Sequence, residues 1–405
     1  MSLKNFDKVN YVPVLNGSVL NCAIREDLFI NGKRATFYTK DGIYNYPKFL
    51  INPYHHDEVF SKIPKDNILD DSLKLADSGG LQEVNLGEKR HDPEEVFKWQ
   101  QEHVDIGFSM DSIPFKNESG RFTGWVFDKA NFIKHAEKSR ENNNDCKKIH
   151  KRDGFLYYGI IQGRQYNEYL DWYNVIRDDT FIDGYCVKTP TNNPVNLAET
   201  IIFAINNITP PIHFLGVGNQ SKALMVYYAN KYLKQKITFD SSSYDIGTQF
   251  RSYLLPGFEA INGKARFVSL KNVEKDETCN KEEIITPDNL NDWCECIVCK
   301  TIGDQLPQMI VDNAPILGGM LSVHNLIMNI KWNNYIRDVI NANNKKKLDK
   351  FINANFDTEL ANKIQMGIGM IDMAVERGPE YTFKHFEHAT SVNQDFSAQK
   401  GIWDF

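Results

Sequence analysis

The chain has 405 residues, of which 41% are hydrophobic, 12% aromatic and 25% charged. This composition is typical of a globular protein and excludes a disordered or fibrous one. With 47 Lys and Arg against 53 Asp and Glu, the formal net charge is −6, so no overall positive field indicates a nucleic-acid partner. No apolar run reaches the roughly 18 residues that cross a bilayer, and the N-terminus lacks an apolar signal segment, so we expect a cytoplasmic protein without a membrane partner.

Short β-rich apolar runs alternate with longer amphipathic runs between about residues 70 and 270. This alternation predicts repeated βα units around a parallel sheet. The predicted strands are 72–76, 105–110, 156–161, 181–187, 212–217, 237–239 and 265–270. One predicted helix begins after Asp92, which can cap it, with Pro93 in its first position. Other helices are predicted near 129–142, 194–207 and 219–234.

Polar residues or glycines follow the ends of successive predicted strands. They are Asp77, Asp111, Gln162, Lys188, Gly216, Gly218 and Asp240. In a (β/α)8 barrel the carboxyl ends of all strands converge on one face, where active sites are built. An open doubly wound sheet also places ligands at strand ends, but the G-x-G-x-x-G of its first βα turn is missing here. We therefore predict an α/β protein built on a TIM barrel.

Three of the seven cysteines lie within six positions, in the pattern Cys294-x-Cys296-x2-Cys299. In a chain without a secretion signal this spacing indicates metal ligands rather than disulfides. His324, in a helix-like stretch, would complete a set of three thiolates and one imidazole. Such a set fills the tetrahedral shell of Zn2+ and leaves no position for water, so the prediction is a structural zinc. The alternative is three free thiols in a turn.

The βα alternation ends after the last predicted strand, where the charged stretch KNVEKDET leads into the cysteine cluster. Long helical patterns follow near 320–340 and 357–377. We expect a barrel over 1–270, an inserted zinc-binding subdomain with a return helix over 271–345, and a C-terminal helical segment over 346–405 that packs on the barrel.

Three acids end predicted strands, and the first begins a glycine-containing motif. The motif consists of Asp77, Ser78, Gly79, Gly80, Leu81 and Gln82. Its glycines let the backbone approach a ligand closely. Asp77, Asp111 and Asp240 on one barrel face would repel one another unless their pKa values separate, which provides an acid and a nucleophile at neutral pH. Glycosidic-bond chemistry uses such a pair, whereas the alternative is that each acid only caps the helix after its strand.

These residues resemble the tRNA-guanine transglycosylases, the queuine and archaeosine tRNA-ribosyltransferases. The matches occur in the family's order over about residues 70–330, so together they are stronger evidence than any single match. They are Asp77–Gln82, Asp111, Gly159–Gly163, Asp183–Tyr185, Leu215–Gly218, Phe239–Asp240 and the Cys-x-Cys-x2-Cys...His set. The resemblance implies a TIM barrel with a zinc subdomain after its eighth strand.

The resemblance also implies that one base replaces another on a nucleic acid, without ATP or a redox cofactor. Asp240 matches the nucleophile that attacks C1′, expels guanine and forms a covalent glycosyl-enzyme. Asp77 matches the general acid/base, and Asp111 and Gln162 match the residues that read a base flipped into the pocket. Further substrate-binding residues are expected at Ser78, Gly79, Gly80, Gln82, Lys188, Gly216, Gly218 and Arg251.

The sequence departs from the family pattern at three places. Leu81 replaces the aromatic residue that stacks on the base, and Lys188-Thr189 replaces a Gly-Gly pair. After Asp240 the family has a Pro-Thr-Arg-type segment that binds the backbone of the anticodon loop, and here a serine-rich segment replaces it. Arg251 is the residue expected to keep one phosphate contact. This pattern looks like the DNA-acting branch, the 7-deazaguanine DNA transglycosylases of bacteria and phages. We therefore expect guanine in DNA to be exchanged for a 7-deazaguanine such as preQ0, in a bacterial or phage-infected cell.

Other functions stay open at this point. One alternative is that the enzyme acts on tRNA instead of DNA. Another is that the chain is a non-catalytic nucleic-acid-binding subunit, although retention of all three acids argues against this. An ordinary glycoside hydrolase is disfavoured because the zinc motif and the DSGG motif have no role in it. The sequence leaves open whether the chain forms a homodimer or needs an accessory protein.

Overall fold

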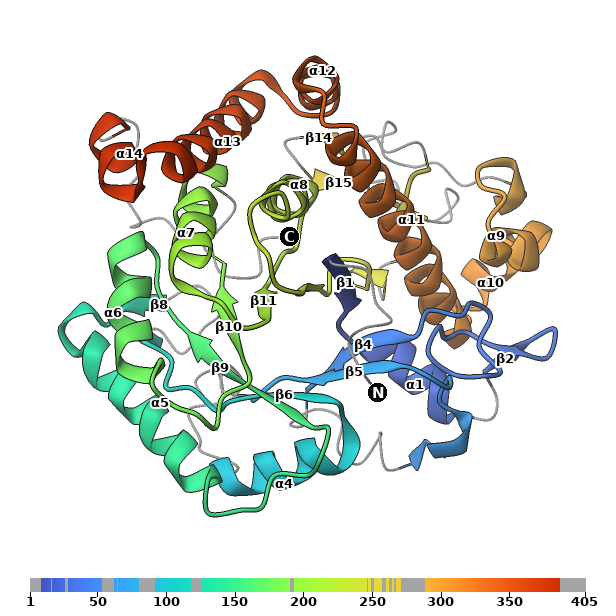
Figure 1. The fold of residues 1–405 in the computed structure, drawn as a ribbon. Helices are drawn as coiled ribbons and strands as arrows, with labels where there is room; N and C mark the ends of the chain where they lie inside the picture. Colours follow the sequence, from blue (N-terminus) through green and yellow to red (C-terminus); the bar gives the residue numbers. More distant parts are fainter. Residues whose placement is uncertain are drawn as a thin grey trace.

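The computed structural model has an eight-stranded parallel sheet at its centre, rolled into a barrel and surrounded by helices (Figure 1). The strands are β1 (Val9–Pro13), β4 (Lys48–Ile51), β5 (Leu73–Ala76), β6 (Ile106–Phe108), β9 (Leu156–Ile161), β10 (Gly184–Lys188), β11 (Ile212–Leu215) and β12 (Ile237–Ser241). Their order is β1-β12-β11-β10-β9-β6-β5-β4, and one parallel bridge between Val14 and Leu50 joins the two end strands. The predicted barrel architecture is confirmed to this extent: a near-closed parallel sheet with helices outside it.

The structure describes most of the chain. The described residues are 9–15, 17–25, 28–52, 62–63, 65–79, 92–117, 125–189, 193–245, 247–248, 251–256, 260–261, 264–265, 267–270 and 288–386. Among these residues no helix combines the length and the apolar character that a bilayer crossing requires.

Six of the seven predicted strands are confirmed as β5, β6, β9, β10, β11 and β12. The prediction of a barrel strand at 265–270 is wrong, because β16 (Phe267–Ser269) pairs antiparallel with β13 (Ser252–Leu254) outside the barrel. Residues Lys264–Ala265 form β15, which pairs with β14 (Ala260–Ile261). The two remaining barrel strands are β1 and β4, which precede the region where strands were predicted.

Helices cover the outside of the barrel. They are α1 (Gly17–Ile24), α4 (Pro93–His103), α5 (Phe132–Cys146), α6 (Tyr166–Ile176), α7 (Pro194–Asn207), α8 (Gln220–Ala229) and α11 (Pro315–Asn341). The predicted start of α4 is confirmed: Pro93 is its first residue, and the Glu95 carboxylate accepts a hydrogen bond from the backbone N–H of Asp92 at 3.1 Å. Because α11 packs against both α8 and α1, it fills the place of the helix after the eighth barrel strand.

Two separate apolar layers hold the barrel together. The inner layer consists of strand residues only: Val12, Leu50, Leu73, Leu75, Ile106, Phe108, Tyr158, Ile160 and Cys186. The intervening strand residues, such as Tyr11, Ile161 and Phe239, pack outward against the helices. This division follows from the two-residue repeat of a strand and shows which side chains face the barrel axis.

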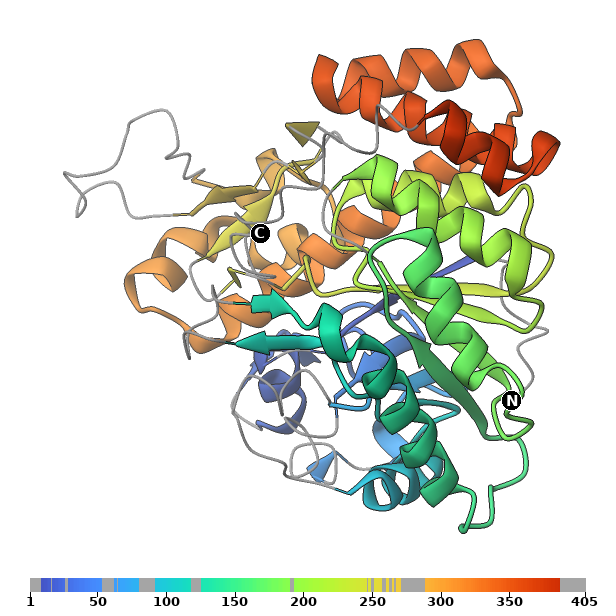
Figure 2. The same ribbon diagram turned by 90° about the vertical axis from the view of Figure 1, so that its left-hand side faces the viewer.

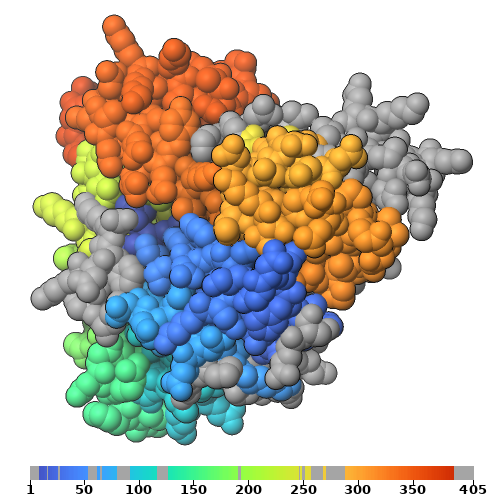
Figure 3. Space-filling model, turned by 90° about the vertical axis from the view of Figure 1, so that its right-hand side faces the viewer, coloured from blue at the N-terminus to red at the C-terminus, as the bar shows by residue number. Residues whose placement is uncertain are grey.

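The segment between β12 and α11 forms a subdomain beside the barrel (Figures 1 and 2). It contains the two hairpins named above and the short helices α9 (Ile297–Ile302) and α10 (Leu306–Val311). Its buried residues, among them Tyr253 and Val298, form a third apolar cluster together with one face of α11. On one side of the molecule this subdomain lies next to the N-terminal part of the chain, drawn orange and blue in Figure 3.

The remaining elements lie at the edges of the barrel. Two small hairpins pair β2 (Phe29–Ile30) with β3 (Lys33–Arg34), and β7 (Phe115–Asn117) with β8 (Trp125–Phe127). At the C-terminal side α12 (Lys345–Asn355), α13 (Thr358–Arg377) and α14 (Pro379–His385) follow α11. The helix predicted near 357–377 is thus confirmed as α13, which packs across α7 and α8.

Candidate functional site

The inward-facing side chains change from apolar to polar at the carboxyl ends of the barrel strands. Each polar side chain lies two positions after an inward-facing strand residue, so it points to the same side. These side chains are Asp77, Gln162, Lys188 and Asp240. The sequence therefore builds a polar ring on top of an apolar barrel interior, at the end where this fold carries its active sites.

Two of the three predicted acids are held by hydrogen bonds and repel each other. Gln162 Nε2 donates to Asp111 Oδ2 at 2.6 Å, and both side chains are buried. Burial raises the pKa of Asp111 to about 6, an effect that the Gln162 hydrogen bond reduces and the charge of Asp77 increases. Burial also raises the pKa of Asp77, which accepts a 2.8 Å hydrogen bond from the backbone N–H of Ser78. Both groups therefore favour the protonated form more than a solvated aspartate does.

The third acid, Asp240, is held through a single oxygen. Its Oδ1 accepts a hydrogen bond from the backbone N–H of Gly216 at 2.8 Å and lies 3.1 Å from His213 Nε2. Gly216 has a φ of 73°, in the left-handed region that favours glycine. The charge of Asp240 adds to the effect of burial in raising the pKa of Asp77, so the two carboxylates lie within electrostatic range of each other. The Asp240 side chain is 13% exposed and hence accessible from the end of the barrel.

Two lysines offset part of this negative charge. The charge of Lys188 lowers the pKa of both Asp77 and Asp111. Lys222, in the first turn of α8, is buried and donates from Nζ to the carbonyl oxygen of Gly216 at 3.0 Å. Burial lowers the pKa of Lys222 to about 7, and the nearby Lys188 contributes in the same direction. The Lys222 ammonium group therefore loses its proton at a lower pH than a solvated lysine does.

Most of the predicted site residues come together in the structure. Those with a contact or an electrostatic interaction among them are Asp77, Ser78, Asp111, Gln162, Lys188, Gly216 and Asp240, whereas Gly79 and Gly218 follow Ser78 and Val217 in the chain. Arg251 is different, because its Nη2 donates to the carbonyl oxygen of Ile310 and to Asn313 Oδ1, at 3.2 and 3.1 Å. Its guanidinium thus binds the end of α10 in the subdomain. Gly80, Leu81 and Gln82 lie outside the described residues.

Sequence reasoning missed three residues of this site: His213, Thr238 and Lys222. His213 is fully buried, and its Nδ1 lies 2.8 Å from Thr238 Oγ1. A signal was available, because a histidine interrupts the otherwise apolar run Ile212–Leu215. That signal becomes informative only when the strand register shows that His213 faces the barrel axis.

The predicted metal ligands form a compact buried cluster at the junction of the subdomain and the barrel. The ligand atoms of Cys294, Cys296, Cys299 and His324 all lie within 4.8 Å of one another. His324 Nδ1 is 3.4 Å from Cys296 Sγ and 3.3 Å from Cys299 Sγ. A tetrahedral shell with metal–sulfur bonds of about 2.3 Å separates its ligand atoms by roughly 3.5 to 3.8 Å. The donor set and its spacing therefore fit a metal ion.

The surroundings of His324 orient it as a ligand. Its Nε2 donates to the carbonyl oxygen of Leu254 at 2.9 Å, which leaves Nδ1 free to bind a metal. The Tyr253 ring stacks on the imidazole, with centroids 4.0 Å apart and an interplanar angle of 11°. Cys296 precedes α9, Cys299 lies within it, and His324 belongs to α11. A metal ion bound here would join the subdomain to a helix of the barrel ring.

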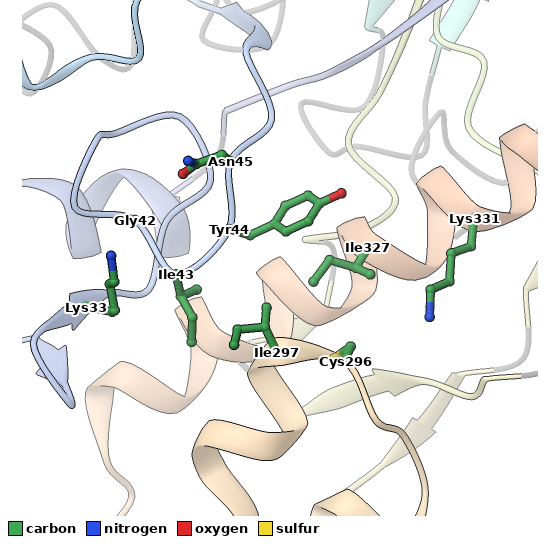
Figure 4. A pocket seen from close by; sticks show the side chains of 9 residues that line it. All are labelled: Lys33, Gly42, Ile43, Tyr44, Asn45, Cys296, Ile297, Ile327 and Lys331. Carbon is green, nitrogen blue, oxygen red and sulfur yellow. The ribbon is translucent and has the colours of Figure 1, made fainter.

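A cavity of about 510 Å3 lies away from the barrel end and next to Cys296 of the metal-ligand cluster, between the segment after β2 and the helices α9 and α11 (Figure 4). It is lined by Lys33, Gly42, Ile43, Tyr44, Asn45, Cys296, Ile297, Ile327 and Lys331. None of these lining residues is acidic. The buried carboxylates Asp77 and Asp111 lie at the barrel end and not at this cavity.

We expect Asp111→Asn to stabilise the protein at neutral pH. Because the folded pKa of about 6 exceeds the ordinary aspartate value of 3.8, the folded state holds the proton more tightly, and stability falls as pH rises through this window. The asparagine removes the free-energy cost of ionising the buried carboxyl group, which is up to about 3 kcal/mol above pH 6. The gain in the free energy of unfolding should vanish near pH 4. Urea unfolding at several pH values measures it, with Asp70→Asn as a control because that side chain is 85% exposed. Equal effects of Asp111→Asn at pH 4 and pH 7.5 would contradict the expectation.

No family model matches this sequence, and no curated protein matches it. Functional assignment therefore depends on the arrangement of the side chains and on the resemblance of the motifs.

Proposed function

We propose that this chain is a base-exchanging guanine transglycosylase. It would replace guanine in a nucleic acid by a 7-deazaguanine such as preQ0, through a covalent ester between the sugar and Asp240. One observation supports this most strongly: both hydrogen bonds that Asp240 accepts within the described part of the chain end on Oδ1. This leaves Oδ2 as the oxygen that can attack a sugar carbon beside two acids that favour protonation.

The exchange needs two displacements at C1′ of the target nucleotide. In the first, Asp240 Oδ2 attacks C1′, the bond between C1′ and N9 of guanine breaks, and Asp77 donates a proton to the departing base. In the second, the Asp77 carboxylate takes the proton from the incoming base, whose nitrogen attacks C1′ and releases Asp240. One N-glycosidic bond replaces another, so the balance requires neither ATP nor a redox partner.

The raised pKa of Asp77 suits this role, because burial and the charge of Asp240 keep the proton available for the leaving base. Asp111 and Gln162 form a hydrogen-bonded pair beside Asp77 that would read the polar edge of the purine. Because C1′ is shielded in a stacked strand, the target nucleotide must be flipped out to reach Asp240. Lys188 would add a cation near the base or its flanking phosphate.

We propose that the cluster of three cysteines and one histidine holds a structural Zn2+. Three thiolates and one imidazole match the ligand preference of zinc, and four protein ligands leave no position for a reactive water. The metal would supply folding energy to the subdomain rather than chemistry at the barrel end. Asp77, Asp111 and Asp240 belong to other elements and are not part of the metal cluster.

Incorporation of labelled guanine tests the proposed function directly. The purified, zinc-replete protein is incubated with radiolabelled guanine or preQ0 and with either DNA or tRNA, and label in the polymer is measured. We expect incorporation into DNA, because the serine-rich segment after Asp240 lacks the tRNA-type grip. Label in tRNA alone would make tRNA the substrate, and no label in either polymer would refute the transglycosylase proposal. Mass spectrometry of nucleosides from cells with and without the protein provides an independent measurement.

A further inference from the structure

His213 is a buried polar residue that takes part in neither displacement at C1′. It lies on β11 with its side chain inside the barrel and fully shielded from solvent. Its ring packs against Phe108 of the inner apolar layer, with centroids 4.7 Å apart. An imidazole in such an apolar environment needs partners for both ring nitrogens.

Both nitrogens have partners, and the partners fix the tautomer. Asp240 is the residue next to Nε2, at 3.1 Å, and its carboxylate can only accept a hydrogen bond. Nε2 therefore carries the proton, and Nδ1 accepts the hydroxyl proton of Thr238 across 2.8 Å. The result is a directed chain from Thr238 through His213 to Asp240 Oδ1.

These hydrogen bonds have a chemical consequence for the Asp240 carboxylate. Two donors, His213 Nε2 and the backbone N–H of Gly216, fix the same oxygen, Oδ1, and so fix the rotation of the Asp240 side chain. The other oxygen is then directed in one orientation. A nucleophile held in its attacking geometry reacts faster than one that must be oriented in each turnover.

We propose that His213 is a positioning residue for Asp240: together with Gly216 it binds Oδ1, so that Oδ2 is presented to the anomeric carbon, and Thr238 keeps His213 in the donating tautomer. The inference rests on the proposed function, because it assigns a role within the same reaction. His213 would touch neither the sugar nor the base and would act only through Asp240.

Other charged and titratable groups also face Asp240. Asp77 lies across the barrel end, and Lys188 and Lys222 approach from β10 and α8. Cys186 of β10 also lies inside the barrel, and burial together with the charges of Asp77 and Asp240 raises the pKa of its thiol. Tyr11 of β1 packs on the outside of the sheet, where burial together with the charge of Asp240 raises the pKa of its hydroxyl far above the ordinary range. Because all of these groups are unchanged in a His213 variant, a difference in its pH profile reports on His213 itself.

Kinetics of three variants test the proposal. His213→Phe keeps the ring and removes both nitrogens, and we expect kcat to fall about 10- to 100-fold with KM for the nucleic acid changed less than about twofold. Loss of a donor disfavours the carboxylate form, so the acidic limb of the pH–rate profile should move to higher pH. His213→Gln carries an amide N–H at a similar reach and should recover most of kcat, whereas Thr238→Val should cause a smaller loss. His103→Phe, on α4, is the control and should match the wild type.

A second measurement does not need activity. Nitrogen-15 NMR of the imidazole in the ligand-free protein should show His213 protonated at Nε2, and the preference should weaken in Thr238→Val. A wild-type protein that shows this tautomer but exchanges no base refutes the proposed function alone. An Nδ1–H tautomer, or a His213→Phe variant with wild-type kcat and pH profile, overturns the positioning role.

Discussion

Replacement of Asp240 by alanine is expected to lower kcat for base exchange by about 10⁴-fold or more, because the covalent intermediate can no longer form. With the incoming base withheld, the wild-type protein should accumulate an adduct with the nucleic acid, and Asp240→Ala should accumulate none. Mass spectrometry of the denatured protein detects this adduct. Normal exchange by Asp240→Ala would refute the assignment of the nucleophile.

Two further variants separate chemistry from folding. Asp240→Asn keeps an oxygen that can accept from Gly216 and His213, so the fold should be intact while exchange is lost. Asp183 is a matched acid at the opposite end of the barrel, where it pairs with Lys151 at 2.8 Å and accepts from the backbone N–H of Tyr157. Asp183→Asn should cost stability but leave adduct formation unchanged. If Asp240→Asn binds nucleic acid normally and the wild type shows no turnover, the chain is a non-catalytic binding subunit instead.

The second large effect is expected from removal of the metal. Structural zinc contributes about 10–16 kcal/mol in small zinc domains at pH 7, so a strong chelator should lower the melting temperature by roughly 10 °C or more. Because three of the four ligands belong to the subdomain, it should unfold before the barrel when the metal is removed, and the melting curve should show two transitions. Differential scanning calorimetry before and after chelation measures this effect.

Single ligand variants define the metal site. Cys296→Ser and His324→Ala should each reduce the metal content well below one equivalent, measured by elemental analysis of the purified protein. Cys146→Ser is the matched control, because Cys146 is also a buried thiol but lies outside the metal cluster, where it donates a hydrogen bond to the carbonyl oxygen of Pro93. Unchanged metal content in His324→Ala would remove His324 from the ligand set.

The repeated part of the fold was predictable, and its two ends were not. β5 and β9 stand out in sequence because apolar β-rich runs are each followed by a helix signal. β1 and β4 are as buried, but they lie in a stretch without a regular strand–helix rhythm. The run around Phe267–Ser269 has the same apolar character, yet it pairs antiparallel, and apolar alternation alone does not distinguish these pairings.

The candidate site shows the same limit at the level of single residues. The cysteine cluster was predictable because its spacing is local in sequence. Asp77 and Asp240 were predictable because they end strands, where a barrel collects its functional groups. His213 and Lys222 were not, because their importance comes from neighbours on other elements and appears only when the strand register is known.

The position of β1 has a consequence for the order in which this protein assembles during synthesis. β1 is the first strand of the chain, yet it pairs along its whole length with β12, where Val12 lies opposite Asp240. Contacts between such distant segments form late in folding, because the intervening chain must be ordered first. A nascent fragment that ends before residue 237 therefore lacks β12, the strand with which β1 pairs, and the barrel closes only when the two ends of the sheet meet.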